Sequence, residues 1–303
     1  MPAAEAAPAV VLLLPERRRF AGQPLSPAVA RALTRGDRGA DAEPGESAQL
    51  LRWFELLPRG WPVAAITRQR DAGDAAGQAW LRADPAFVRP DMTGARVMAI
   101  GDLGLSREET DALLAELRPL FGDAGFALSA PSPSRWYLSL PQGAALPAFS
   151  PPETVLGDDL FLHLPEGPEG RRWRALLNEA QVLLHNHPVN AARLAAGRVP
   201  ANSLCFWGAG RLPDRVRGRV AKVAGDEATL AALAALATET VGEGTLLDLR
   251  AARDWSQVER HLLESLPASG AAGVRLDFAD GAAWTLRPGQ RWRLWRRPLA
   301  ALA

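Results

Sequence analysis

Cysteine and lysine are almost absent from this chain. Cys205 is the only cysteine among 303 residues, which excludes an internal disulfide and any zinc or iron–sulfur site built mainly from thiolates. Lys222 is the only lysine, so nearly all of the positive charge is carried by arginine. A chain without disulfides fits a reducing compartment, and we expect a cytoplasmic protein.

An excess of charge and long hydrophobic runs are also missing. The 35 basic and 34 acidic residues give a net charge of +1, which offers no long-range attraction to polyanions. We therefore expect neither nucleic acid nor a membrane as a partner. The apolar run Val10–Leu14 is too short to span a membrane, and Pro15 and arginines follow it. It predicts a buried strand and not a signal peptide.

Several catalytic motifs are absent as well. No G-x-S-x-G sequence is present to support a Ser-His-Asp triad, and nothing resembles a P-loop. Residues 208–210 read Gly-Ala-Gly, but Pro213 stands where a dinucleotide fingerprint needs its third glycine. The arginine- and tryptophan-rich segment 291–298 could stack on bases or on a cofactor ring. We expect instead a terminal strand whose tryptophans cover the core.

Hydrophobic periodicity predicts the elements of the first ninety residues. They are a buried strand, a long surface loop, a helix and a second core strand, over residues 10–14, 21–46, 47–57 and 63–67. The loop is expected because its segment is rich in glycine, proline and charge.

The chain changes character after Arg89. A strand over 95–100 precedes a helix that begins at Ser106, where Glu109 completes a capping box. Two strands around a proline-rich turn follow over 126–140. This order of elements is typical of a small α+β unit, and a connector rich in proline and glycine follows it.

Helices and strands alternate from residue 170 onward. The predicted helices cover 170–185, 191–196, 227–238 and 255–266, and the predicted strands cover 203–207, 245–249, 273–280 and 282–289. Pro188 ends the first of these helices, Asn190 is placed to cap the next, and Gly197 stops it. The alternation predicts an α/β domain with a mainly parallel sheet.

Five polar residues near this corner are the candidate ligand-binding group. Binding crevices in α/β folds lie at such corners and at the loops that follow strands. Two arginines there could clamp a carboxylate or a phosphate with paired hydrogen bonds. The alternative is structural, with the amides and the histidine satisfying backbone groups and the arginines solvated. The candidates are His187, Asn190, Arg193, Asn202 and Arg211.

Metal-ligand patterns are sparse. His185 and His187 are two residues apart, and on a helix such side chains diverge by roughly 200°. Asp159 and His163 have a D-x-x-x-H spacing found in some two-metal hydrolases, but the same residues also fit a strand with a satisfied histidine. No metal site and no cofactor are therefore predicted from these residues.

One stretch resembles a known family. Residues 183–213, with His-Pro-Val-Asn, Pro-Ala-Asn and Trp-Gly-Ala-Gly, resemble a segment of the archaeal-type cofactor-independent phosphoglycerate mutases of the alkaline phosphatase superfamily. The segments 164–181, 105–117 and 132–140, and the closing Trp-Arg-Arg-Pro, look still more like the bacterial RpfE-type regulatory proteins. The resemblance covers most of residues 80–300 and is strongest over 159–213.

The resemblance implies an alkaline phosphatase-like α/β core interrupted by a smaller α+β insert. With the change of character near residue 90, it places the core at 1–88 and 214–303 and the insert at 89–213. The mutase mechanism implied by the family needs two divalent metals and a serine nucleophile. Here Pro15 and Glu16 follow the first strand, and near the C-terminus His261 is expected in an ordinary amphipathic helix.

Three hypotheses follow from this comparison. The first is a degenerate, metal-free relative with a regulatory role, which binds a small phosphorylated or carboxylated metabolite or a protein partner. The second is an active mutase or phosphatase that holds a manganese or zinc pair on relocated ligands: Asp158, Asp159, His163 and His187. The third is an interaction module that uses its tryptophans and no small molecule.

Overall fold

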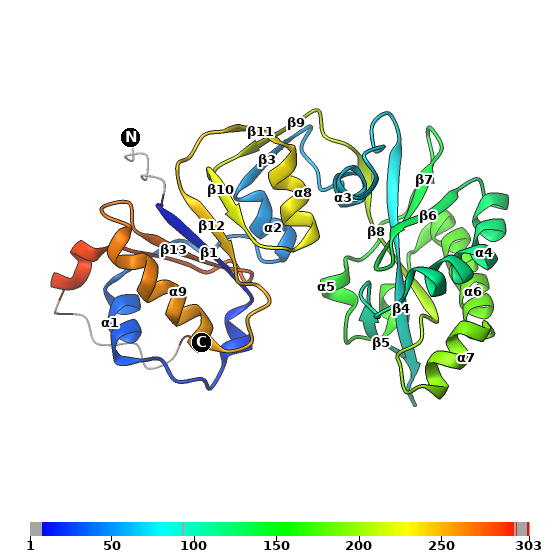
Figure 1. Ribbon diagram of the computed structural model, residues 1–303, viewed down its shortest axis with the longest axis horizontal. Coiled ribbons are helices and arrows are strands. Elements are labelled where there is room, and N and C mark those ends of the chain that lie inside the picture. The colour runs from blue at the N-terminus through cyan, green and yellow to red at the C-terminus, as the bar shows by residue number, and fades with distance from the viewer. Residues whose placement is uncertain (1–7, 93, 294, 296–301, 303) are drawn as a thin grey trace. The chain divides into compact units, whose positions relative to one another are not determined.

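The structure, a computed structural model, describes residues 8–92, 94–293, 295 and 302, and it divides into two compact units (Figure 1). Unit 1 comprises the described residues of 1–59 and 214–303, and unit 2 comprises 60–213. The division expected after residue 88 would instead cut strand β4 (Ala79–Pro90), whose partner strands all belong to unit 2.

A six-stranded, mainly parallel sheet forms the centre of unit 1. The first four strands of the order pair in parallel, and the two remaining pairings are antiparallel. In order they are β10 (Lys222–Ala224), β12 (Thr245–Asp248), β1 (Val10–Leu14), β13 (Val274–Phe278), β14 (Ala283–Leu286) and β2 (Asp37–Arg38). The predicted α/β class is confirmed.

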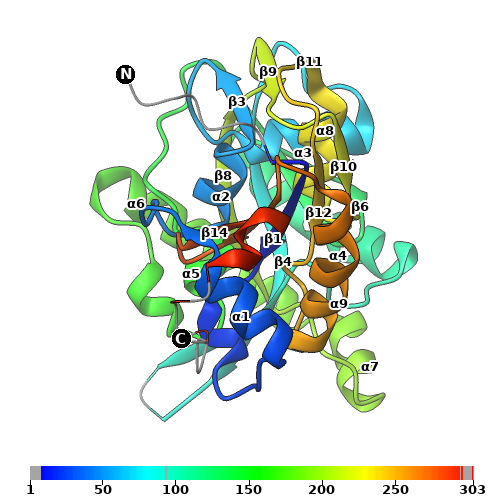
Figure 2. The same ribbon diagram turned by 90° about the vertical axis from the view of Figure 1, so that its left-hand side faces the viewer.

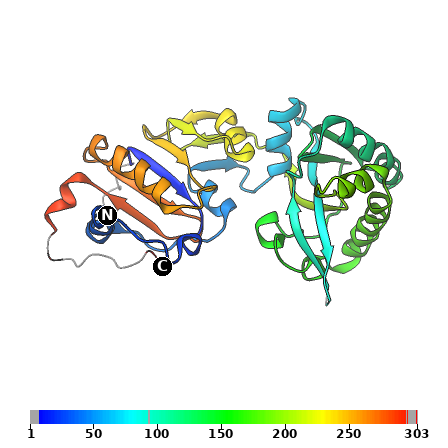
Figure 3. The ribbon, with the colours of Figure 1, turned by 60° about the horizontal axis from the view of Figure 1, so that its bottom comes forward.

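Strand β1 is apolar along its whole length because helices cover both faces of the sheet. Helices α1 (Pro27–Arg35) and α9 (Trp255–Ala268) pack on one face, where their apolar side chains share a cluster with Leu12 and Leu14. Figure 3 shows α9 lying along β1. Helices α2 (Glu46–Leu51) and α8 (Ala228–Leu236) lie on the other side of the sheet (Figure 1).

Helix α1 corrects the expectation of a surface loop over 21–46. The Ser26 hydroxyl accepts a hydrogen bond from the amide of Val29, Pro27 occupies the first turn, and Val29 and Leu33 are buried. A cap, a proline at the start and a short apolar stripe therefore outweigh the polar composition. The 3-10 helix η3 (Pro288–Trp292) lies beside α1, as Figure 2 shows.

Two other expectations for unit 1 were wrong. The helix predicted over 47–57 ends at Leu51, and β3 (Phe54–Leu57) joins β9 (Arg215–Gly218) and β11 (Ala237–Thr240) in a small sheet. A terminal strand was predicted over 291–298, but its first two residues belong to the 3-10 helix η3. Trp292 and Trp295 are 68% and 76% exposed, so they do not cover the core. Residues 294 and 296–298 lie outside the described part of the chain.

Unit 2 is an α+β unit built on an antiparallel sheet. Strand β4 pairs with β8 (Ser203–Arg211) along one edge and with β7 (Arg135–Leu140) and β5 (Ala95–Ile100) along the other, and β6 (Ala127–Ser132) extends β7. The expectation of an α+β insert is therefore confirmed.

Helices cover both faces of this sheet as well (Figure 1). Helices α4 (Arg107–Asp123) and α6 (Gly167–His185) enclose the larger core with the apolar face of β4, and α7 (Pro188–Ala195) follows α6. The capping box predicted at Ser106 and Glu109 is present. Short helices α5 (Pro152–Val155) and η2 (Leu160–His163) lie in the connector. Within the described residues, no helix combines the length and apolarity needed to cross a membrane.

Helix α3 (Val63–Ala72) covers the opposite face of the sheet and corrects the strand expected over 63–67. The apolar run Val63–Ile66 is too short to distinguish a strand from a buried helix by periodicity. Gly208 and Gly210 of β8 allow α3 to approach closely, because a Cβ at Gly210 would lie 2.5 Å from the Cβ of Pro62. The Gly-Ala-Gly sequence is therefore a packing feature between a strand and a helix.

We predict that Gly210→Ala destabilises unit 2 by about 1–3 kcal/mol, because the added methyl group overlaps Pro62 and the backbone φ of +155° suits glycine. Urea unfolding followed by circular dichroism measures the change. Gly122→Ala in α4 is the matched control, since nothing lies within 4 Å of its added methyl group. The control should be neutral or slightly stabilising. Equal stability of the two variants would contradict the packing role.

Candidate functional site

The corner between α6 and β8 is held together by two of the candidate residues. His187, and not Asn190, is the N-cap of α7, and its Nδ1 accepts a hydrogen bond from the amide of Val189 at 3.1 Å. Asn190 is buried inside α7, where its side-chain nitrogen donates to the carbonyls of Leu184 (2.7 Å) and Ala201 (2.8 Å). Its oxygen accepts from the amide of Ala201 at 2.9 Å. Both side chains thus satisfy backbone groups at the corner.

Arg193 is buried in the same corner, with only 1% of its surface exposed. Its guanidinium donates to the carbonyls of Val199 (2.8 Å), Leu103 (2.5 Å) and Gly104 (3.2 Å). It also forms an ion pair with Glu109 at 2.6 Å. These contacts tie α7 to the loop that precedes α4, and they engage all three of the guanidinium nitrogens.

Asn202 directly precedes β8, and Arg211 is the last residue of that strand. The side chain of Asn202 pairs with the backbone of Val88, accepting from its amide and donating to its carbonyl at 2.8 Å each. Arg211 is exposed and lines a surface depression together with Gln78, Ser139 and Gln142. The structure therefore does not gather the five candidates into one site. Contact with a ligand stays a prediction, for which Arg211 is the most accessible of the five.

Glu109 joins the corner electrostatically. Burial raises the pKa of this carboxyl, but the hydrogen bond from the backbone amide of Ser106 and the charges of Arg193 and Arg198 outweigh burial and lower it below its ordinary value. Glu109, which completes the capping box of α4, is thus also the counter-ion of the buried Arg193 of α7. The sequence predicted the capping box but gave no signal for this second role.

The weaker metal candidates are engaged in local contacts. The Oδ1 atom of Asp159 accepts hydrogen bonds from the amides of Ala95 and Phe161, both at 3.1 Å. His163 bonds through Nε2 to Asp158 at 3.0 Å, and this bond is the main reason that the pKa of Asp158 is lowered. Across the residues that the structure describes, no three His, Cys, Asp or Glu side chains form a group suited to a metal ion.

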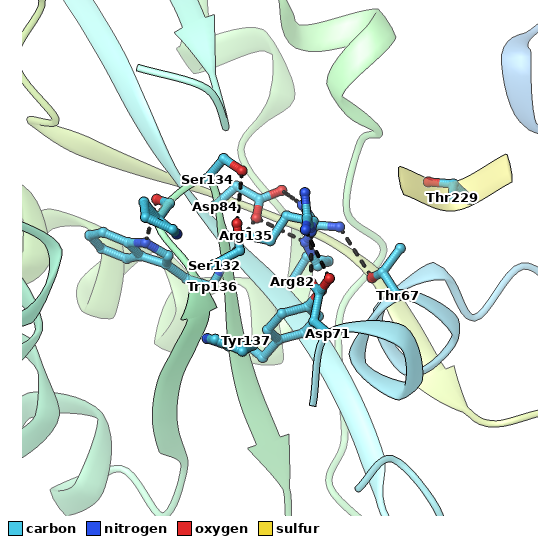
Figure 4. A network of polar contacts seen from close by, with 12 residues as sticks. Thr67, Asp71, Arg82, Asp84, Ser132, Ser134, Arg135, Trp136, Tyr137 and Thr229 are labelled. Atoms are coloured by element: carbon cyan, nitrogen blue, oxygen red, sulfur yellow. Dashed lines mark hydrogen bonds and ion pairs between the residues drawn. The ribbon is translucent and has the colours of Figure 1, made fainter. Parts of the chain in front are cut away.

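A buried polar network under α3 has no counterpart in the sequence predictions (Figure 4). Arg82 of β4 lies between two aromatic rings on neighbouring strands, with its guanidinium carbon 5.3 Å from the centre of Tyr137 and 5.1 Å from that of Trp207. It donates to Asp84 at 2.8 Å and to the hydroxyl of Thr67 at 3.2 Å. Asp84 in turn accepts from the indole of Trp207 at 2.7 Å.

Asp71 at the end of α3 anchors the second half of this network. It accepts from Nε and Nη2 of Arg135, at 2.7 and 2.8 Å, and from the hydroxyl of Tyr137 at 2.6 Å. Burial raises the pKa of Asp71, but the bonds from Arg135 and Tyr137 outweigh burial and lower it. The network is closed by its own partners, which favours a role in attaching α3 to the sheet.

The carboxyl edge of the parallel sheet in unit 1 is a second candidate for a ligand site, because open α/β sheets bind ligands at the carboxyl ends of their strands. Three carboxylates lie within or just beyond the ends of β12 and β13, and each is bonded to an arginine of the same unit. The pairs are Asp248 with Arg250 at 2.7 Å, Asp277 with Arg52 at 2.6 Å, and Asp280 with Arg17 at 2.7 Å. Each of these three carboxylates is thus neutralised by a neighbouring arginine.

Arg250 is the most enclosed of the three arginines. Its side chain is 6% exposed. The guanidinium bonds to both oxygens of Asp248 and to Glu227 at 3.1 Å, and it lies 3.8 Å from Glu46. Burial lowers the pKa of Arg250, but the bonds and charge of Asp248, with Glu227 and Glu46, outweigh burial and raise it above its usual value. One fixed cation therefore holds three carboxylates at this edge.

The chain is similar over part of its length to known phosphoglycerate mutases. It is 43% identical over 63 residues to a probable 2,3-bisphosphoglycerate-independent phosphoglycerate mutase of Geobacter sulfurreducens, and 38% identical over 64 residues to that of Methanosarcina mazei. Each match covers 21% of this chain and 16% of the relative. No protein-family model matches the chain.

Two solved structures resemble the chain over most of its length. The match to a cofactor-independent phosphoglycerate mutase of Thermoplasma acidophilum covers 92% of this chain and 89% of that protein, with a TM-score of 0.40 and 17% identity. The match to the PH0037 protein of Pyrococcus horikoshii covers 95% of this chain and 93% of that protein, with a TM-score of 0.45 and 12% identity.

Arg193→Ala tests the structural role of the corner. We expect the free energy of unfolding to fall by about 3–5 kcal/mol, because Glu109 and three carbonyl oxygens lose a buried partner. Denaturant titration measures this loss. The matched variant Arg211→Ala removes an exposed guanidinium and should change stability by less than about 0.5 kcal/mol. A small effect at Arg193 would mean that it is available for a ligand.

The lowered pKa of Glu109 gives a pH prediction. Its stabilising contribution is present above the carboxyl's unfolded pKa and is lost as the pH falls through its lower folded value. Between about pH 7 and pH 3, stability should fall less in Glu109→Gln than in the wild type, and the two should differ most at neutral pH. Asp111→Asn, an exposed carboxylate on α4, is the control. Parallel stability curves for Glu109→Gln and wild type would contradict the prediction.

Proposed function

We propose that this chain is a phosphoglycerate mutase-like protein that no longer turns over phosphoglycerate and holds no pair of divalent metals. Its role is regulatory, as in the RpfE-type proteins that its sequence resembles. It binds a small phosphorylated or carboxylated metabolite or a protein partner. The kinship is supported by the partial similarity to the mutases, and the remaining points depend on the carboxyl edge of unit 1.

The single observation that carries the loss of metals is the pairing of the edge carboxylates with arginine. A metal-dependent phosphoryl transfer needs carboxylates that are free to bind cations, which offset the charge crowded around the phosphate. Here Asp248, Asp277 and Asp280 already neutralise guanidinium groups. The residues of this edge therefore do not fit a metal pair, and Pro15 and Glu16 follow β1 without a serine or aspartate.

The exposed charges suggest where a metabolite or partner would bind. Arg211 lines the depression on unit 2 with Gln78, Ser139 and Gln142, and an exposed guanidinium among hydrogen-bonding groups suits a phosphate or carboxylate. Trp292 and Trp295 of unit 1 are exposed, and exposed tryptophans are enriched at protein interfaces. Arg211 is the residue by which we test metabolite binding.

One observation keeps the active enzyme as a second candidate. Asp158 and His163 are in contact at 3.0 Å, and such a pair could begin a metal site on relocated ligands. Asp159 and His187 accept backbone hydrogen bonds elsewhere in unit 2, so they do not complete that site as they stand. A manganese or zinc pair would therefore require the connector that carries Asp158 to rearrange.

A coupled mutase assay with 3-phosphoglycerate and manganese separates these functions. We expect turnover at the background rate of the assay with folded, full-length protein, with or without added metal. Isothermal titration with 3-phosphoglycerate should show binding to the wild type that is weakened roughly tenfold in Arg211→Ala, as expected for loss of one charge-assisted contact. Arg215→Ala, which removes an exposed arginine of unit 1, is the control. Metal-dependent turnover would overturn the proposal.

A further inference from the structure

Three segments far apart in the sequence meet around Arg250. Asp248 is the last residue of β12, Glu227 is the N-cap of α8 and follows β10, and Glu46 is the first residue of α2. Their carboxylates approach the Arg250 guanidinium at 2.7, 3.1 and 3.8 Å. A single buried positive charge therefore connects the end of β12, the segment between β10 and α8, and the start of α2.

The geometry is that of a cation held by carboxylates, with the cation supplied by the chain. Asp248 binds the guanidinium through both oxygens, and it also accepts from the backbone amide of Arg250 at 3.1 Å. Glu227 still caps α8 through the amides of Thr229 and Leu230, both at 2.9 Å. The carbonyl of Arg250 accepts from Arg19 at 3.2 Å, which fixes the loop from its other side.

We propose that the guanidinium of Arg250 is the permanent occupant of the cation position at this edge, and that it excludes divalent cations while joining β12, α8 and α2. The inference goes beyond the proposed function, because it assigns one residue the electrostatic role that a bound metal has in other proteins. It also makes a positive prediction. Removal of the guanidinium should leave three carboxylates that can bind a divalent cation.

The chemistry of the three side chains suits that exchange. Without the arginine, three negative charges would repel one another, and a hard cation with oxygen ligands would relieve this repulsion. A metal needs its oxygens at about 2.0–2.6 Å, closer than Glu227 and Glu46 now lie to the guanidinium. The side chains of those two residues are 42% and 52% exposed, so they have room to close in on an ion, whereas Asp248 is fixed in the protein interior.

The test measures manganese binding to full-length variants by thermal unfolding and by isothermal titration. The wild type should have the same unfolding midpoint in manganese and in EDTA. Arg250→Ala should unfold at a lower temperature in EDTA and regain several degrees as manganese is added, with a saturable one-to-one titration. The double variant Arg250→Ala with Asp248→Asn should lose this recovery.

Arg250→Met is the matched control, because it removes the charge but fills the space that a cation would need. It should be destabilised without any response to manganese. Arg250→Lys keeps a positive charge and a folded protein even where the alanine variant fails to fold, and it too should not bind manganese. Manganese binding to Arg250→Lys or to the wild type, abolished by Asp248→Asn, would overturn the proposal. So would a folded Arg250→Ala protein that binds no manganese.

The outcome is distinguishable from the fate of the proposed function. Mutase turnover by the wild type would overturn the proposed function. It would overturn this inference only if the metal required for turnover were lost with Asp248. Conversely, a folded Arg250→Ala protein without affinity for manganese would overturn the inference and leave the assays of phosphoglycerate binding unaffected.

Discussion

A buried guanidinium group must meet carboxylates and carbonyl oxygens, because an unpaired charge or donor in the protein interior is strongly destabilising. This constraint shapes both units of the protein. In unit 1, Arg250 gathers three acidic residues at the carboxyl edge of the sheet. In unit 2, Arg193 binds three carbonyls and Glu109, and Arg82 is enclosed by Asp84, Thr67 and two aromatic rings. With lysine almost absent, these roles fall to arginine, whose planar group suits paired contacts.

The need to pair buried charges also separates the elements that the sequence predicts from those that it does not. Strands β1 and β13 and helices α4 and α6 are predictable, because apolar side chains recur at the period of the element and caps or prolines mark their ends. Strand β4 is the longest strand of unit 2 and was not predicted. Its sequence, AWLRADPAFVRP, carries Arg82, Asp84 and two prolines, and a central strand with buried charges contradicts the alternation of apolar and polar residues.

The partners that make β4 possible are distant in sequence. Arg82 needs Thr67 from α3, Tyr137 from β7 and Trp207 from β8, and none of these can be paired with it by local pattern. Misreading α3 as a strand had the same origin, since its apolar residues are explained only by the sheet that it covers. The boundary expected after residue 88 came from the change of character near residue 90 and from the family resemblance, and the structure places it between Arg59 and Gly60. Tertiary partners, and not local propensity, decided these segments.

The candidate site was predictable in its residues but not in their roles. The motif His-Pro-Val-Asn places His187 as a helix cap, Pro188 in the first turn and Asn190 as a bridge to the backbone of Ala201. The Pro-Ala-Asn sequence supplies that backbone and the side chain of Asn202, which pairs with Val88. The glycines of Trp-Gly-Ala-Gly allow α3 to approach β8, and Trp207 closes the network around Asp84.

Each part of the motif that resembles the mutases therefore has a structural explanation within unit 2. A segment under such constraints can keep its sequence for the sake of folding, whether or not a reaction takes place nearby. Resemblance of this motif to the mutases therefore does not by itself indicate activity, which has to be judged from the carboxyl edge of the other unit. At that edge, Asp248, Asp277 and Asp280 are paired with guanidinium groups of the chain. They neutralise carboxylates as metal ions would, but they offer no open coordination position at which a phosphate or an activated hydroxyl could bind.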